Sequence, residues 1–297
     1  MKKRNCYKVA GHNVSLTGEA AQLAALRLSP YEPFAIEPTD DTLFDVEIVE
    51  ELDDAIIEPV LVDAPLSSPG MPKVDIFSVE CGLLYQITMP FLDEINASLI
   101  VDKAKRLVRV KLGGTPMGQY LAISNVFILS FVSFGMEHNT LLLHASTVIH
   151  EGRAYLFLGK SGTGKSTHSR MWLEAFPDSE LLNDDHPLVR VHDDGSVVAY
   201  GSPWSGKTPC YRNLSAPLGA IVRIERSLAN TLVPLSPLKY YASITTSCSG
   251  VQWSAELMES KVHAVEQIIK NSKGYTMRCL PNREAAEVCF EGIKADQ

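Results

Sequence analysis

Hydrophobic and polar residues alternate in several stretches of the first 115 residues, which is typical of half-buried β-strands. Strands are predicted at 46–49, 74–79, 84–89 and 107–112. A short helix is predicted at 20–28, and the prolines between 59 and 72 predict a long surface loop. The first 115 residues therefore form a strand-rich region.

The pattern changes after this region. Residues 118–137 form an apolar run that predicts a helix. From residue 141, short apolar stretches alternate with loops and then with helices. Strands are predicted at 141–143, 154–158, 180–182, 188–191, 197–200, 220–224 and 275–280. Helices are predicted at 168–175, 253–269 and 283–293, the last with Asn282 as its N-cap.

These elements predict an α/β protein, α+β overall. Its expected divisions are a strand-rich N-terminal region at 1–115, an apolar connecting helix at 116–140 and a C-terminal domain at 141–297. The N-terminal region is a candidate for acceptor recognition or for a lid.

Composition narrows the class of protein. Apolar residues make up 45% of the 297 residues, which is ordinary for a globular chain. The formal net charge is −8, which argues against nucleic-acid and anionic-membrane partners. All charged residues between Glu37 and Glu58 are acidic. This acidic segment is either a solvated edge or a partner surface.

The cysteine and apolar patterns favour a cytoplasmic protein. The six cysteines are scattered and include no C-x-x-C pair, which suits reduced thiols. The N-terminus has no apolar signal core. Residues 118–136 are the one candidate membrane span, but they carry five Ser, Asn or Gln residues. A buried helix is the better interpretation, and no membrane partner is expected.

A phosphate-binding loop is the strongest motif. Residues 159–167 read GKSGTGKST and fit G-x-x-x-x-G-K-[ST] between an apolar strand and a helix, which is the required context. The expected nucleotide contacts are Gly159, Ser161, Gly162, Thr163, Gly164, Lys165, Ser166 and Thr167. Lys165 would reach the outer phosphates, and the Ser166 hydroxyl would face Mg²⁺.

A second motif, Asn183-Asp184-Asp185-His186, follows the apolar pair Leu181-Leu182. One carboxylate can help to hold Mg²⁺, while the other accepts a proton from an attacking hydroxyl. The alternative is a helix cap or an Asx-turn, because Asp and Asn favour both. His186 would contact a phosphate or begin the turn set by Pro187.

Other residues are weaker candidates. His144 precedes the phosphate loop on a strand expected to lie beside it, and Lys207 offers a positive charge in a Gly/Pro loop. Arg212 would stabilise phosphoryl charge or form a surface ion pair. His168 is expected to face outward.

The order of these motifs resembles ATP-dependent phosphoenolpyruvate carboxykinase. The phosphate loop followed by paired aspartates also resembles HPr kinase/phosphorylase, and the overall look is similar to HPr-kinase-related proteins. The resemblance covers residues 141–225. It implies that Asp184 acts as base or acid, and that Asp185, Ser166 and His144 hold metal. It also implies that Lys207, with Lys165, lies near the transferred phosphoryl group.

The chain also departs from both families. No Lys or Arg lies between Lys111 and His144, so the carboxykinase's lysine ligand is missing. Thr167 stands where HPr kinases have an acidic residue. Neither oxaloacetate decarboxylation nor phosphorylation of HPr itself is therefore expected.

The sequence thus predicts an HPr-kinase-like, ATP-dependent phosphotransferase that uses ATP and Mg²⁺, with Mn²⁺ as an alternative. Its acceptor would be a hydroxyl on a protein, a peptide or a small molecule. One alternative is a carboxykinase-like enzyme acting on a small carboxylate. Another is a nucleotide-sensing ATP-binding module without independent turnover. Because HPr kinases are hexamers, the resemblance leaves a homo-oligomer open.

Overall fold

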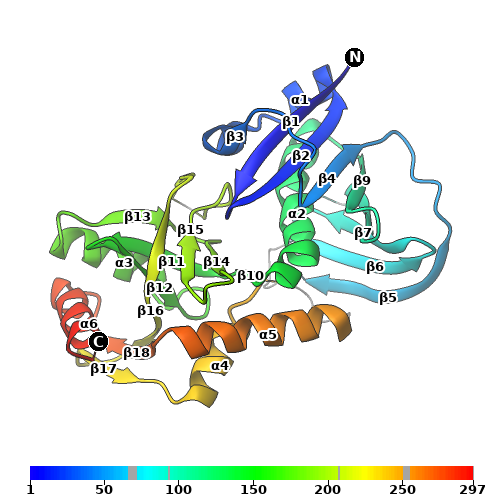
Figure 1. The fold of residues 1–297 in the computed structure, drawn as a ribbon. Helices are drawn as coiled ribbons and strands as arrows, with labels where there is room; N and C mark the ends of the chain where they lie inside the picture. Colours follow the sequence, from blue (N-terminus) through cyan, green and yellow to red (C-terminus); the bar gives the residue numbers. More distant parts are fainter. Residues whose placement is uncertain (66–71, 93, 207, 250–254, 297) are drawn as a thin grey trace. The chain divides into compact units, whose positions relative to one another are not determined.

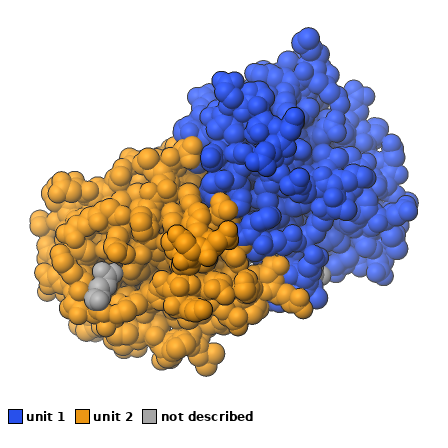
Figure 2. Space-filling model, in the orientation of Figure 1, with its two compact units in different colours: residues 1–138, 250–258 blue, residues 139–249, 259–297 orange. Residues whose placement is uncertain are grey.

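The computed structural model describes residues 1–65, 72–92, 94–206, 208–249 and 255–296. It has two compact units, which are coloured separately in Figure 2. Unit 1 holds residues 1–138 and 250–258, and unit 2 holds residues 139–249 and 259–297. Both units combine strands with helices (Figure 1), so the prediction of a mixed α/β protein is confirmed.

Unit 1 is built on one twisted sheet. The strands run in the order β3-β1-β2-β4-β9-β8-β7-β6-β5. Their bounds are β1 Lys2–Val9, β2 His12–Glu19, β3 Ala35–Ile36, β4 Phe44–Ile48, β5 Ile56–Pro65, β6 Lys73–Val79, β7 Gly82–Thr88, β8 Ile95–Asp102 and β9 Leu107–Leu112. Strand β4 runs parallel to β2 and β9, and the remaining pairs are antiparallel.

Four helical segments accompany this sheet: α1 Ala20–Ala25, the 3-10 helices η1 Ser29–Phe34 and η2 Met136–His138, and α2 Pro116–Gly135. Helix α2 begins at Pro116, and its N-cap Thr115 accepts a hydrogen bond from the Gly118 amide at 3.2 Å. It packs against β7, β8 and β9. By length and composition Pro116–His138 could cross a membrane, yet 61% of its apolar window is buried inside the protein. This burial is the pattern of a core helix.

The surface loop predicted from Pro59 onward is wrong as far as Pro65. Residues Ile56–Pro65 form β5, which pairs only with β6 in the described part of the sheet. A proline is tolerated on such an outer strand, because its missing N–H would face away from the neighbouring strand. The continuation of the predicted loop, 66–71, lies outside the described residues.

Half of the ten acidic residues in the segment Glu37–Glu58 are paired with cations within unit 1. Their carboxylates form ion pairs with cations of neighbouring strands, at 2.6–2.8 Å between nitrogen and oxygen: Arg4 with Asp40 and Asp45, Lys2 with Glu47, Arg109 with Asp54, and Lys111 with Glu51. The paired side chains of Asp40 and Glu51 are still 98% and 71% exposed, so the interpretation as a solvated edge agrees with the structure, and the partner surface stays a prediction.

Unit 2 has a second sheet in the order β10-β14-β15-β16-β12-β11-β13, with β18 also beside β16, and β17 beside β18. The strands are β10 Thr140–Leu142, β11 Ala145–His150, β12 Arg153–Leu158, β13 Glu180–Asn183, β14 Leu188–Val191, β15 Val197–Tyr200, β16 Ser215–Arg226, β17 Thr231–Pro234 and β18 Gly274–Cys279. Strands β12, β16 and β18 are parallel neighbours.

The helices of unit 2 are α3 Lys165–Ala175, α4 Pro237–Thr245 and α6 Arg283–Asp296, together with most of α5 Ala255–Asn271. Helices α3 and α6 pack together, and fully buried Trp172 contacts the rings of Tyr155 and Phe290. Asn282 accepts a hydrogen bond from the Ala285 amide at 3.1 Å, so the predicted N-cap of α6 is confirmed.

One feature of this sheet brings distant segments together. Strand β11 runs antiparallel to both β12 and β13, with Ala145 opposite Leu158 and Thr147 opposite Asn183. The start of β11 therefore meets the ends of the other two strands. The predicted proximity of the His144 strand to the phosphate-loop strand is confirmed.

Candidate functional site

The predicted phosphate loop joins β12 to α3. Gly159, Gly162 and Gly164 have φ values of +153°, +78° and +114°, a backbone region that favours glycine. A Cβ at Gly159 would lie 2.7 Å from Thr163 Oγ1. Because Gly164 is the N-cap and makes no side-chain cap bond, the first amides of α3 have no capping side chain. This backbone geometry is compatible with the predicted phosphate loop.

Lys165 opens helix α3. Its side chain is largely buried, and Nζ donates to the Gly159 carbonyl at 3.0 Å. Burial lowers the pKa of Lys165, while the carboxylates of Asp185 and Asp184 act in the opposite direction. This opposition means that both aspartates lie within electrostatic reach of the lysine.

The other loop side chains are more open to solvent. Ser161 and Ser166 are exposed, and half-buried Thr167 accepts a hydrogen bond from Arg170 at 3.4 Å. Thr163 bonds back to the Lys160 carbonyl. The hydroxyl of Ser166 is therefore accessible on the first turn of the helix.

Arg226, the last residue of β16, contacts the loop from a neighbouring strand. Its Nη2 donates to the Gly162 carbonyl, and its Nε donates to the Thr163 carbonyl at 3.4 Å. Two carbonyls of the loop are thereby held by one guanidinium group. Arg226 is not among the predicted site residues, because more than 60 residues separate it from the two carbonyls that it contacts.

The Asn183–His186 turn is organised by its asparagine. Fully buried Asn183 accepts hydrogen bonds from the amides of Asp185 at 2.9 Å and His186 at 2.8 Å. Its Nδ2 donates to the Trp204 carbonyl at 2.9 Å. The predicted alternative of an Asx-turn is therefore present, but Asn183 makes it. The carboxylates of Asp184 and Asp185 remain available for other contacts.

Asp184 is held from the neighbouring strand. Its Oδ1 accepts a hydrogen bond from Ser146 Oγ at 2.7 Å, and Ser146 Oγ lies 2.6 Å from Ser169 Oγ. Because the Ser146 proton is given to Asp184, Ser169 is the donor in the second bond. The two serines, both buried, orient one oxygen of Asp184 and leave the other for a further partner.

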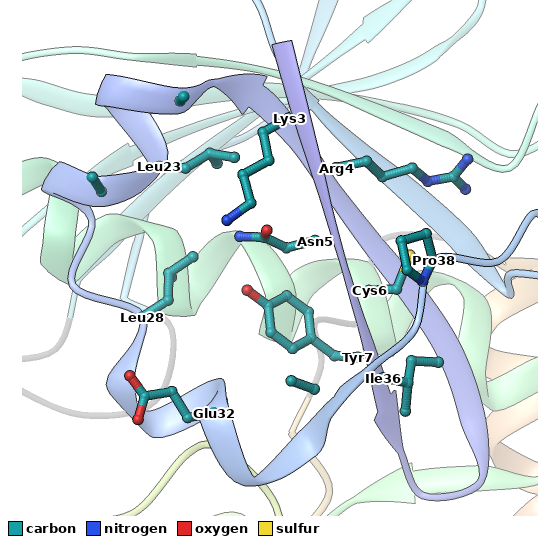
Figure 3. Close-up of a pocket in the computed structure, with 13 residues that line it drawn as sticks. Lys3, Arg4, Asn5, Cys6, Tyr7, Leu23, Leu28, Glu32, Ile36 and Pro38 are labelled. Atoms are coloured by element: carbon teal, nitrogen blue, oxygen red, sulfur yellow. The ribbon is translucent and has the colours of Figure 1, made fainter. Parts of the chain in front are cut away.

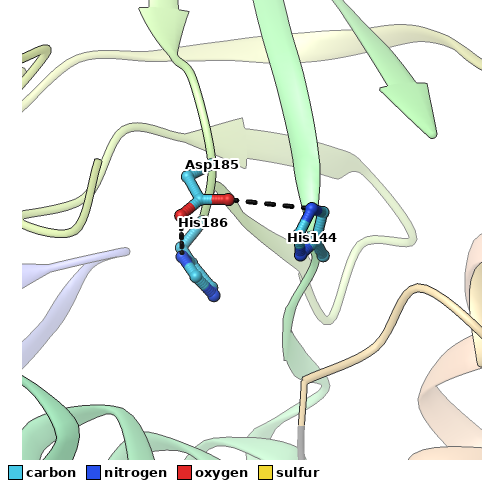
Figure 4. A group of neighbouring side chains, drawn as sticks. All are labelled: His144, Asp185 and His186. Carbon is cyan, nitrogen blue, oxygen red and sulfur yellow. Dashed lines mark ion pairs between the residues drawn. The ribbon is translucent and has the colours of Figure 1, made fainter. Parts of the chain in front are cut away.

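Asp185 lies between two histidines, and Figure 4 shows all three side chains. Its Oδ2 lies 3.1 Å from His186 Nδ1, and its Oδ1 lies 3.8 Å from His144 Nε2. One ligand atom of each residue lies within 4.8 Å of the others. Imidazole and carboxylate ligands suit a transition metal or zinc. His186 thus joins the metal-ligand candidates His144 and Asp185.

Backbone bonds hold these two segments side by side. The Ala145 amide donates to the Asp185 carbonyl at 3.0 Å, and the Leu143 amide donates to the Pro187 carbonyl at 3.0 Å. These bonds flank His144 on one segment and His186 on the other. The proximity of the histidines therefore follows from the backbone.

The charges of this cluster influence one another. Burial acts to raise the pKa of Asp185, but His186, His144 and Lys165 together bring it below its usual value. Burial and the neighbouring Lys165 lower the pKa of His144. At neutral pH the site therefore combines an ionised carboxylate with a neutral imidazole, which is the form that binds a metal.

The other residues singled out in the sequence, Lys207, Arg212 and His168, have different outcomes. Lys207 lies outside the described residues. Arg212 forms an ion pair with Glu180 at 2.6 Å, which matches the surface alternative. The expectation that His168 faces outward is wrong. His168 is buried and accepts a hydrogen bond from Trp172 Nε1 at 3.1 Å. Burial lowers its pKa to about 4.

Comparisons with known proteins identify a family. Residues 119–274, more than half of the chain, match the family described as SynChlorMet cassette protein ScmC, and the chain belongs to this family. No curated protein matches the sequence.

Among solved structures, the chain is similar to the Hpr(Ser) kinase/phosphatase from Coxiella burnetii. The TM-score is 0.31 with 11% sequence identity, over 52% of this chain and 99% of the other. This loose likeness to a kinase fold carries no conclusion about catalytic residues.

Proposed function

We propose that the protein is an ATP-dependent, HPr-kinase-like phosphotransferase that transfers the γ-phosphoryl group to a hydroxyl acceptor. One observation carries the proposal: β11 lies between β12 and β13, so the predicted phosphate loop with Lys165 and the carboxylates of Asp184 and Asp185 follow strand ends that meet the start of β11. A phosphate loop alone would indicate only nucleotide binding. A carboxylate pair at its lysine adds a proton acceptor and a metal ligand.

The loop fits a polyphosphate chain. A Cβ at Gly162 would meet no atom within 4 Å, so there is open space beside this part of the loop. Amides at the start of α3 and the Lys165 ammonium are suited to phosphate oxygens. Ser166 and Asp185 would hold Mg²⁺, and bound Mg²⁺–ATP supplies the phosphoryl group and neutralises part of its charge.

Asp184 is the proposed base. Ser146 and Ser169 orient its carboxylate, so its remaining oxygen lone pairs can accept the proton of the acceptor hydroxyl. The hydroxyl oxygen then bonds to phosphorus while the bond to the leaving diphosphate breaks. Lys165 stabilises the charge that develops on the phosphate oxygens. A matching role for Lys207 remains a prediction.

A second candidate function is a carboxykinase-like reaction on a small carboxylate. The His144–Asp185–His186 group favours it, because such a donor set suits a transition metal such as Mn²⁺. Here His186 would stand in place of the lysine ligand that the sequence lacks. Transfer that depends on a transition metal and on a carboxylate substrate would support this alternative.

The wider biological assignments are proposals as well. The net charge of −8 supports a protein without a nucleic-acid partner. All six cysteines are free thiols, which supports a cytoplasmic location. We propose a protein, peptide or small-molecule acceptor bound by residues of the N-terminal region. A homo-oligomer stays a prediction, which the mass of the protein in solution tests.

The test uses γ-labelled ATP, Mg²⁺ and extract of the source cell, with products separated by size. The wild-type chain is compared with Asp184→Asn and with Asp178→Asn, a matched change at an exposed position of unit 2. We expect Asp184→Asn to lose transfer about 100-fold to 10,000-fold, since this is the usual contribution of a general base. Asp178→Asn should transfer normally.

The labelled fraction identifies the kind of acceptor. Label in protein or peptide indicates a protein or peptide kinase, and label in small molecules indicates a metabolite kinase. Undiminished transfer by Asp184→Asn would refute the base. No label with ATP still bound would indicate a nucleotide-sensing module.

A further inference from the structure

A hollow lies beside strand β1 in unit 1 (Figure 3). Its volume is about 520 Å³. Helices α1 and η1 border it opposite β1. Residues that line it include Lys3, Asn5, Tyr7, Leu23, Leu28 and Glu32.

Strand β1 leaves part of its outer edge open. On one side it pairs with β2 from Lys2 to Val9. On the other side, the described residues pair with it only at Cys6 and Tyr7, through the two-residue strand β3. Residues 2–5 therefore have no strand neighbour on that side in the described part of the chain.

The hydrogen-bond pattern shows which backbone groups face this edge. The Ala20 amide donates to the Met1 carbonyl at 3.2 Å, and the two-residue turn at 10–11 closes the pair Val9–His12. In an antiparallel pair, hydrogen-bonded positions alternate. Odd-numbered residues of β1 therefore bond to β2, and the amides and carbonyls of Lys2 and Arg4 face outward.

The side chains of β1 that face the hollow differ in chemical character. Figure 3 shows Lys3, Asn5 and Tyr7 on one side of β1, while Arg4 and Cys6 lie on the other. Tyr7 is buried, and Leu23 supplies an apolar wall. The same face of the edge thus offers a cation, an amide and an apolar surface.

Lys3 differs in charge pairing from its two neighbours. Lys2 pairs with Glu47 at 2.7 Å, and Arg4 pairs with Asp40 and Asp45 at 2.7 and 2.8 Å. Lys3 forms no ion pair with any residue in the described ranges. Its ammonium group is therefore available to a carboxylate from outside unit 1.

We propose that an extended peptide segment binds along the outer edge of β1 as an added strand. Arg4 would exchange backbone hydrogen bonds with the peptide residue directly opposite. The residues on either side of that one would point to the hollow face, because alternate side chains share a face. One carries a carboxylate for Lys3, and the other carries an apolar side chain for the Leu23 wall. Only the further step, that this peptide is the phosphoryl acceptor, rests on the proposed function.

The test uses fluorescein-labelled eight-residue peptide pools and the full chain without ATP. The first pool has Glu and Leu fixed two residues apart, with the other positions degenerate. The second replaces Glu by Lys, and the third keeps Glu and Leu but places Pro between them. We expect the first pool to bind about tenfold more tightly than either of the others. Lysine would repel Lys3, and proline lacks the amide that donates to the Arg4 carbonyl.

Two protein variants distinguish the effect of the charge at Lys3 from the effect of the net charge of the protein. Lys3→Glu should weaken binding of the Glu-Leu pool about tenfold and improve binding of the Lys-Leu pool. Lys8→Glu makes the same charge change at an exposed position of β1 that does not line the hollow, and it should change neither.

Equal effects of Lys3→Glu and Lys8→Glu would overturn the proposal, as would equal binding of the proline pool or no binding of any pool. A chain dimer that Lys3→Glu dissociates, with no peptide binding, would assign the edge to a second copy instead. Asp184→Asn should bind the pools as the wild type does. Binding without Asp184-dependent labelling would refute only the proposed function. Labelling without binding would refute only the docking edge.

Discussion

The acidic segment of unit 1 and the residues around Lys165 in unit 2 differ in how their charges are paired. In unit 1, five of the ten carboxylates of the acidic segment pair with Lys or Arg of neighbouring strands, as Arg109 pairs with Asp54 at 2.7 Å. In unit 2, Lys165 and Asp185 follow the ends of β12 and β13, His144 precedes the start of β11, and each of the three has a displaced pKa. A charged residue with an ion-pair partner in the same unit contributes to the fold. Charged residues that shift one another's pKa values at the ends of neighbouring strands are candidates for binding a ligand.

The same contrast applies to hydrogen-bonded polar groups. Ser146 and Ser169 are buried, and the hydrogen bonds of their hydroxyl groups orient Asp184. In unit 1, Ser15 and Thr42 bond to Asp45 in a similar way, at 2.5 and 3.1 Å, but that carboxylate is also paired with Arg4. Among the described residues, the oriented carboxylate of Asp184 forms no ion pair with Lys or Arg, whereas that of Asp45 is paired with Arg4.

The largest expected effect tests the charge cluster of unit 2. Lys165→Ala should raise the dissociation constant for ATP about 1,000-fold, or about 4 kcal/mol, through the loss of about two charge-assisted hydrogen bonds to phosphates. Isothermal titration calorimetry measures the change. Lys160→Ala is the control, because it removes an exposed lysine from the same loop. Equal losses in the two variants would mean that the cluster does not bind phosphate specifically.

The next effect concerns the helix behind the phosphate loop. Burial lowers the pKa of His168 from 6.5 to about 4, so the unfolded state binds the proton first as the pH falls. Stability should therefore decrease between about pH 6.5 and pH 4, by about 3 kcal/mol in total.

Urea denaturation at pH 7 and pH 4 measures this term. The variant His168→Gln, which keeps an acceptor for Trp172, should lose about 3 kcal/mol less than the wild type over this interval. The same pH dependence in both proteins would contradict the assignment to His168.

A smaller effect sharpens the contrast at the metal-ligand candidates. His186→Asn should weaken Mn²⁺ binding about tenfold, because it removes one of three converging ligands. Electron paramagnetic resonance of free Mn²⁺ gives the affinity without any assay of activity. His192→Asn should leave the affinity unchanged, because His192 bonds to Tyr200 instead. A loss in the His192 variant alone would remove the basis for this site.

The smallest effect lies in unit 1. Arg109→Ala breaks the pair with Asp54 and should lower the free energy of unfolding by about 1 kcal/mol or less, as for other partly exposed pairs. ATP affinity should stay the same. A large change in ATP affinity would break the comparison, since it would give a paired charge of unit 1 a role in nucleotide binding.

Local sequence predicted those parts of the fold whose chemistry depends on spacing. The apolar run before Gly159 and the helix after it follow from the geometry that a phosphate loop requires. The structure has β12 ending at Leu158 and α3 beginning at Lys165, which is before the predicted start at residue 168. The strand and turn around Asp184 were likewise predicted from residues that are neighbours in the sequence. The chemical roles of these residues stay predictions.

The features that sequence did not predict depend on contacts between distant residues. Ser169 meets Ser146 only because α3 packs against β11, and Arg226 reaches the loop only because β16 lies beside β12. The proline-containing strand β5 was mistaken for a loop because its outer position in the sheet is a property of topology. His168 was misplaced because helix periodicity alone does not say how wide the buried face is.

Helix α5 has a consequence for synthesis of the protein. Its first residues, including Glu256, belong to unit 1, where Glu256 lies 3.4 Å from Lys103, whereas the rest of the helix belongs to unit 2. A nascent chain emerges from its N-terminus, so residues 1–138 leave the ribosome long before Glu256. Unit 1 can therefore be completed only after most of unit 2 has been translated. A chain truncated at residue 138 would lack the part of unit 1 that residues 250–258 supply.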